Sequence, residues 1–172
     1  MSSDPESLLK SFIDLEKLPH ALIFVGDDFE QMNRSAHSFA KEVFMRFEPN
    51  KDHLFKMDHH SHLDFHEYAP LSKAGQFSIE QIKQICSLSN LYPNEAQKQF
   101  FVLNHADRMQ DAAANALLKT LEEPSKDSIF ILIVENLDTM LETIISRTHK
   151  IYFQESQDAI EEKNYSLVLN EL

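Results

Sequence analysis

The side chains best suited to metal chemistry are concentrated between residues 53 and 66. His60, His62 and Asp64 alternate along the chain, a spacing typical of metal-dependent hydrolases, and His59 precedes them. Imidazole and carboxylate groups are common zinc ligands, so His59, His60 and His62 are candidate metal ligands. Such an enzyme needs further ligands at other strand ends, and the remaining histidines form no matching pattern. We therefore expect residues 48–61 to form a solvated polar loop, with the hydrolase as an alternative.

A second candidate site follows a short apolar run at residues 21–25, which ends at Gly26. A phosphate-binding loop at this place would read Gly-x-x-x-x-Gly-Lys-Ser/Thr. Its backbone N–H groups and lysine bind the phosphates, and its hydroxyl holds magnesium. Only Gly26 matches here, because Met32 stands at the lysine position and Asn33 at the hydroxyl position. This pattern predicts a degenerate phosphate loop.

Acidic residues follow Gly26 at the place where a phosphate would arrive. Asp27, Asp28 and Glu30 each carry a negative charge, and at ~4 Å such a charge opposes a phosphate by roughly 1 to 4 kcal/mol. Asp27 and Asp28 also suit the start of a helix, where carboxylates are favoured. We expect side chains, and not a nucleotide, to satisfy this helix end.

The elements that position these residues alternate along the chain. Apolar runs predict strands at residues 21–25, 64–69, 100–103, 129–134 and 150–153. Helical spacing predicts helices at 4–18, 29–47, 78–90, 111–123 and 138–145. This alternation indicates an α/β fold with a parallel sheet covered on both faces, in which ligands bind at the carboxyl ends of strands.

Two local patterns refine the helices. Ser78 and Gln81 match a capping box, in which each side chain bonds to the other residue's backbone N–H. The helix at 111–123 is expected to direct four residues into the core: Ala112, Ala116, Leu117 and Leu121.

Composition limits the class of protein. The 172 residues, 42% of them apolar, fit one domain at 1–153, with 154–172 beginning a helical lid domain or a truncated tail. We see no run of ~18 apolar residues and no signal peptide, and therefore expect a cytoplasmic protein with no membrane partner. Cys86 is alone, which excludes an internal disulfide. The net charge of -12 argues against a free-standing nucleic-acid binder.

Four strings occur in a recognisable order. They read PHAL at residues 19–22, HLD at 62–64, NALLKTLEEP at 115–124 and SRT at 146–148. They resemble segments of the delta-prime subunits of bacterial DNA polymerase III clamp loaders, which belong to the AAA+ family. The last string resembles that family's Ser-Arg-Cys motif with Thr148 in place of cysteine. The resemblance covers most of the chain.

The resemblance implies a P-loop NTPase fold of the AAA+/RecA-like type, three layers thick, with a five-stranded parallel sheet. Active relatives carry Asp-Glu after the third strand, where this chain has Asn104 and His105, so a second degenerate motif is expected. No ATPase activity and no cofactor are then expected. Arg147, with Ser146, is expected to serve a neighbouring ATPase subunit as a trans-acting arginine finger. The four zinc-binding cysteines of many relatives are missing.

The implied function is that of a non-catalytic stator in the loader that places the sliding clamp on primed DNA. The expected partners are the motor (gamma/tau) and delta subunits, and indirectly the clamp and the primer-template DNA, in a hetero-oligomer of full-length chains. Alternatives are an active ATPase of the same family and a non-catalytic AAA+ scaffold in another replication or repair assembly.

Overall fold

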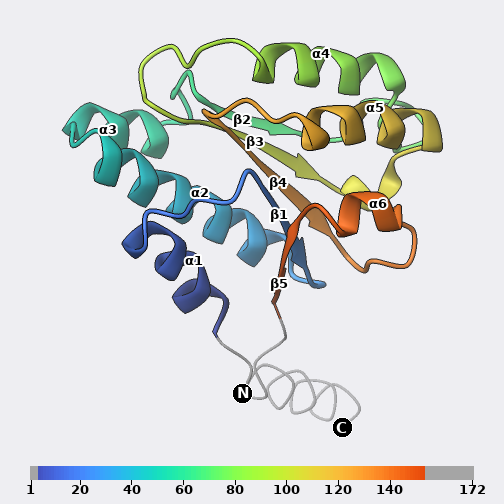
Figure 1. Cartoon of the computed structure of the whole chain (residues 1–172), viewed down its shortest axis with the longest axis horizontal. Coiled ribbons are helices and arrows are strands. Elements are labelled where there is room, and N and C mark those ends of the chain that lie inside the picture. The colour runs from blue at the N-terminus through green and yellow to red at the C-terminus, as the bar shows by residue number, and fades with distance from the viewer. Residues whose placement is uncertain (1–3, 154–172) are drawn as a thin grey trace, which may run out of the picture.

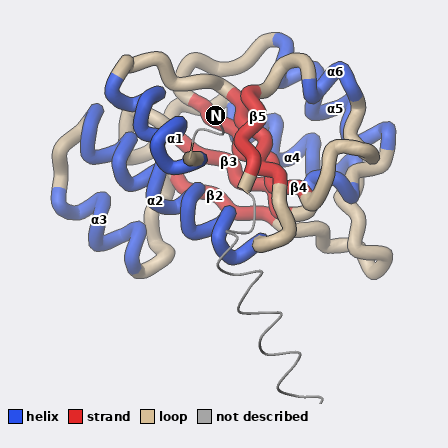
Figure 2. Tube along the Cα trace, turned by 90° about the horizontal axis from the view of Figure 1, so that it is seen from below, coloured by secondary structure: helices blue, strands red, loops and turns tan. Residues whose placement is uncertain are grey.

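The computed structural model describes residues 4–153, which form a β-sheet between two layers of helices (Figures 1 and 2). The segment 154–172, expected to begin a lid or a tail, lies outside the described residues. None of the helices within 4–153 is long and apolar enough to cross a membrane.

All five strands run parallel, in the order β2-β3-β4-β1-β5. Their bounds are β1 Ala21–Val25, β2 Phe65–Tyr68, β3 Gln99–Asn104, β4 Ser128–Val134 and β5 His149–Tyr152. The central strands are buried on both faces, which explains why they appear in the sequence as continuous apolar runs. The expected α/β fold with a five-stranded parallel sheet is confirmed.

The helices cover the sheet on both sides (Figure 2). One side carries α1 Pro5–Asp14, α2 Phe29–Phe47 and α3 Lys51–Asp58. The other carries α4 Ile79–Ser89, α5 Asp111–Glu122, α6 Glu142–Ile145 and the 3₁₀ turn η1 Ala106–Arg108. Successive strand residues face opposite layers, so each side has its own apolar core.

Helix α3 corrects the loop expected at residues 48–61. Asn50 caps it by accepting a hydrogen bond from the backbone N–H of Asp52 at 3.0 Å. Its buried positions are His53 and Met57, four residues apart. The pattern was missed because one of the two inward residues is a histidine, which reads as polar in a sequence.

One of the two hydrogen bonds predicted for the capping box is present. The Ser78 hydroxyl accepts from the backbone N–H of Gln81 at 3.1 Å. The Gln81 amide, however, donates to the carbonyl of Ala69 at 2.8 Å, which ties α4 to the end of β2.

Two other helices differ in detail. Ala112 is exposed, and Ala113 and Ala114 are buried in its place beside the predicted Leu117 and Leu121. Helix α6 spans only Glu142–Ile145, because the residues before it form turns, including one in which the Asn136 side chain accepts from the Asp138 N–H.

A buried histidine pair attaches α3 to the sheet. His62 stacks on Phe44 with ring centroids 4.2 Å apart, and its Nε2 lies 2.9 Å from Nδ1 of His53. The backbone N–H of Asp64 donates to His62 Nδ1 at 3.1 Å, so Nε2 carries the ring proton and donates to His53. Burial lowers the pKa of His62, against the opposing effect of Glu95, so the neutral ring is favoured.

Asp64 is the anchor at the start of β2. Its carboxylate is fully buried and accepts four hydrogen bonds from the loop that leads into β3. One oxygen accepts from the backbone and side-chain N–H groups of Asn94, and the other from the backbone N–H groups of Glu95 and Ala96, at 2.6–3.1 Å. The acid of the HLD string therefore has a structural role.

We predict that Asp64→Asn destabilises the domain by at least ~2 kcal/mol. The amide nitrogen would replace an oxygen that accepts two hydrogen bonds, and each unsatisfied buried donor costs about 1–3 kcal/mol. Urea denaturation measures the loss. Asp58→Asn is the control, since that carboxylate pairs with Lys41 at the surface and such pairs contribute less than about 1 kcal/mol. Equal effects of the two substitutions would contradict the anchoring role.

The histidines also predict a pH dependence. Burial lowers the pKa values of His20, His62 and His66, so the unfolded chain binds more protons than the folded one below about pH 7. The free energy of unfolding should therefore fall as the pH drops through ~6.5, by at most ~1.4 kcal/mol per pH unit for each histidine.

His62→Asn keeps an acceptor for the Asp64 N–H and removes the titrating ring, so its stability should depend less steeply on pH than that of the wild type. His59→Asn, at an exposed ring on the same segment, is the matched control. Denaturation at several pH values between 5.5 and 7.5 decides; identical slopes for wild type and His62→Asn would show the prediction to be wrong.

Candidate functional site

The loop between β1 and α2 is only Gly26, Asp27 and Asp28, because α2 already begins at Phe29. The backbone N–H of Gly26 donates to the carbonyl of Val134 at 3.1 Å. A Cβ atom on Gly26 would lie 2.6 Å from the carbonyl oxygen of Phe153. Close packing against its neighbours therefore requires glycine here, whether or not a phosphate binds.

The first turn of α2 is satisfied from within the chain. The Asp28 carboxylate accepts from the backbone N–H of Gln31 at 2.8 Å and so occupies the helix end at which anions are usually bound. Glu30 pairs with Arg34 one turn along. Met32, at the lysine position, is fully buried in the apolar core.

Asn33 and Asn104 meet at the carboxyl end of β3. The Asn33 side-chain amide donates to Oδ1 of the Asn104 side chain at 2.7 Å and to the backbone carbonyl of Phe29 at 2.8 Å. His105 adopts a left-handed backbone conformation (φ 56°), and its ring stacks on Phe29 at 4.1 Å. The structure thus pairs Asn33 with Asn104 and places Gly26 against Met32, while His105 stacks on the first residue of α2.

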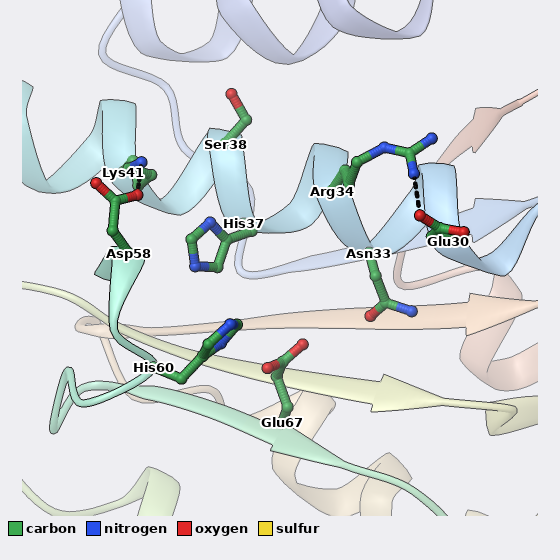
Figure 3. A pocket seen from close by; sticks show the side chains of 9 residues that line it. All are labelled: Glu30, Asn33, Arg34, His37, Ser38, Lys41, Asp58, His60 and Glu67. Atoms are coloured by element: carbon green, nitrogen blue, oxygen red, sulfur yellow. Dashed lines mark hydrogen bonds and ion pairs between the residues drawn. The ribbon is translucent and has the colours of Figure 1, made fainter. Parts of the chain in front are cut away.

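A groove of about 420 Å³ lies beside this site, between α2 and β2 (Figure 3). Its charged side chains include two ion pairs, Glu30–Arg34 and Lys41–Asp58. We did not predict this groove. The signal was present as a polar stripe along α2 at helical spacing: Glu30, Asn33, Arg34, His37, Ser38 and Lys41.

The candidate metal ligands do not converge. His59 is exposed and stacks on Phe55, His60 faces His37 across the groove, and His62 is buried against Phe44. Within residues 4–153, no three His, Cys, Asp or Glu side chains are placed to hold a metal ion. The carboxylate of Asp64 is already satisfied by backbone donors, so this geometry gives the hydrolase alternative no support.

Arg147 lies at the amino-terminal end of the strands, in the turn between α6 and β5, whereas Gly26 lies at their carboxyl end. The pairing of Leu22 with His149 places Arg147 level with His20, before β1 begins. Gly26 follows the end of β1, so the two sites are about 20 Å apart at ~3.3 Å per residue. The guanidinium contacts Glu122 through Nη2 at 3.0 Å and donates through Nη1 to the Thr143 carbonyl at 2.9 Å.

Comparison with known proteins identifies the family of this chain. The family model described as "DNA polymerase III, delta subunit" matches residues 2–157. The delta' subunit of DNA polymerase III from Bacillus subtilis is 34% identical over 166 residues, which cover 91% of this chain and 49% of that protein. The Haemophilus influenzae delta' subunit is 35% identical over 91 residues, covering 53% of this chain and 28% of that protein. The chain thus spans about half the length, or less, of these relatives.

Solved structures show the same fold. A gamma subunit-related protein of DNA polymerase III from Thermotoga maritima superposes with a TM-score of 0.70 at 22% identity, covering 90% of this chain and 47% of that one. The clamp loader delta protein of Bacillus subtilis gives 0.61 at 9% identity, covering 88% and 43%. With the family match over nearly all of its length, this chain belongs to the delta' family of DNA polymerase III clamp-loader subunits.

Proposed function

We propose that this chain is the AAA+-type domain, residues 1–153, of a clamp-loader delta' subunit that hydrolyses no ATP itself and supplies Arg147 to the ATP site of a neighbour. The observation that carries the proposal is the position of Arg147, at the amino-terminal end of the strands and therefore opposite Gly26. A side chain about 20 Å away cannot reach a nucleotide beside Gly26, at ~3.3 Å per strand residue. It can reach a nucleotide held by another subunit.

A head-to-tail ring provides that geometry. In a heterologous interface, one edge of each subunit contacts a different edge of the next. Here the side of this domain that carries Arg147 would face the carboxyl ends of the strands in a motor subunit. An arginine placed there neutralises charge on the phosphate being transferred, and its planar fork suits phosphate oxygens.

The chain's own site is poorly suited to MgATP. Asp28 occupies the helix end where a phosphate would bind, and Met32 is a buried apolar side chain where a lysine is required. Asn33 and Asn104 bond to each other, and magnesium prefers carboxylate ligands over such amides. These contacts support a nucleotide-free site stabilised by the chain itself.

The assembly follows from the family. We expect the full-length subunit to bind motor (gamma/tau) and delta subunits in a hetero-oligomer and to contribute to loading the sliding clamp onto primer-template DNA. The matches include tau and gamma/tau subunits. With a net charge of -12, this chain would leave most contacts with DNA phosphates to its partners.

Arg147→Ala should lower DNA-stimulated ATP hydrolysis by the reassembled loader about tenfold or more, since a trans-acting arginine contributes ~10³ to 10⁵ at the site it serves. Binding of ATP to the motor subunits should change little. Arg46→Ala, at an exposed arginine that pairs with Glu16, is the matched control. Hydrolysis as fast as in the wild type would show that Arg147 does not act on a neighbour's ATP.

Titration of the isolated subunit with MgATP in a calorimeter should show no binding tighter than about 1 mM, because a carboxylate, and no lysine, faces the phosphate position. The motor subunit of the same loader is the positive control. A micromolar dissociation constant for this chain would contradict an inactive site.

A further inference from the structure

We propose that Glu122 is a positioning residue for Arg147, an inference that rests on the proposed trans-acting role of that arginine. Glu122 is the last residue of α5 and the second residue of the LEEP segment at 121–124. Its carboxylate oxygen Oε1 lies 3.0 Å from Nη2 of Arg147. This contact connects α5 to the turn before β5.

The guanidinium is held on one side and open on the other. Nη1 donates to the Thr143 carbonyl at 2.9 Å and approaches the Ser146 hydroxyl at 3.4 Å, and Nη2 forms an ion pair with Glu122. An arginine has five N–H donors, and both hydrogen bonds of the Arg147 guanidinium are made through Nη1, so the hydrogens on Nε and Nη2 remain available for phosphate oxygens. The side chain is 37% exposed, which leaves the available donors accessible to a partner.

The carboxylate has no evident role within its own helix. A negative charge in the last turn of a helix is disfavoured by the helix dipole, and α5 ends with Glu122 followed by Glu123. Arg147 offsets this charge. In turn, the buried Leu117 and Leu121 fix α5 against the core, so Glu122 offers the arginine a rigid point of attachment.

A long arginine side chain loses rotamer freedom when it docks on a phosphate. Contacts made beforehand to Glu122 and Thr143 restrict the guanidinium to one region before the neighbour's nucleotide arrives. The benefit should be modest, because both partners are partly exposed. An exposed ion pair of this kind corresponds to a change in rate of about two- to fivefold.

The test compares Glu122→Gln with Glu123→Gln in the full-length subunit, reassembled with its motor and delta subunits. Glu123 is exposed and adjacent, and the ion pair of Arg147 is with Glu122. DNA-stimulated ATP hydrolysis is measured over a range of ATP concentrations. Glu122→Gln should lower kcat about two- to fivefold with KM unchanged, Glu123→Gln should match the wild type, and Glu122→Asp should recover part of the loss.

Combination with Arg147→Ala separates positioning from a general structural effect. If Glu122 acts through Arg147, the double variant should be no slower than Arg147→Ala alone. Circular dichroism melting of each variant confirms that it folds, and Glu122→Ala replaces Glu122→Gln if the latter does not fold.

The outcomes distinguish this inference from the proposed function. No effect of Arg147→Ala would remove the trans-acting finger, and with it the positioning role. A slow Arg147→Ala loader, together with a Glu122→Gln loader that is as fast as Glu123→Gln or faster, would leave the finger in place and overturn the role of Glu122. An additive loss in the double variant would also overturn it.

Discussion

The common direction of the five strands determines how this domain can take part in chemistry. Because β1 and β5 are parallel neighbours, Gly26 follows the end of one, and Arg147 precedes the start of the other. Two apolar cores, one on each face of the sheet, hold these strands in register. The separation of the two sites is therefore a property of the fold, and no side-chain rearrangement within one chain brings them together.

At the carboxyl ends of the strands, the chain itself satisfies the first turn of the helix that follows β1. The N-terminus of a helix that follows a parallel strand can bind an anion, because its first N–H groups have no partner within the helix. Here Asp28 provides the anion, Met32 adds to the core, and Gly26 is needed for its packing against Phe153. At these positions the side chains therefore have structural roles: Asp28 caps the helix and Met32 fills the core.

The sheet and its five strands could be predicted from the sequence, because strands buried on both faces appear as continuous apolar runs. The strand–helix order also placed Asn33 and Asn104 after two strands of the same sheet, although their contact was not predicted. The histidines were harder, since nothing local distinguishes the buried His53 from the exposed His59. The contact between Glu122 and Arg147 could not be predicted, because it depends on how α5 packs against the turn before β5. That relation is set by tertiary packing and not by spacing along the chain.

The most direct test is a structure of the reassembled loader with clamp, primed DNA and a transition-state mimic such as ADP with aluminium fluoride. The account predicts that the guanidinium of Arg147 lies within hydrogen-bonding distance of the phosphate mimic in the adjacent motor subunit. It also predicts no nucleotide beside Gly26. Magnesium and nucleotide seated at Gly26, or an Arg147 side chain far from any phosphate, would contradict it.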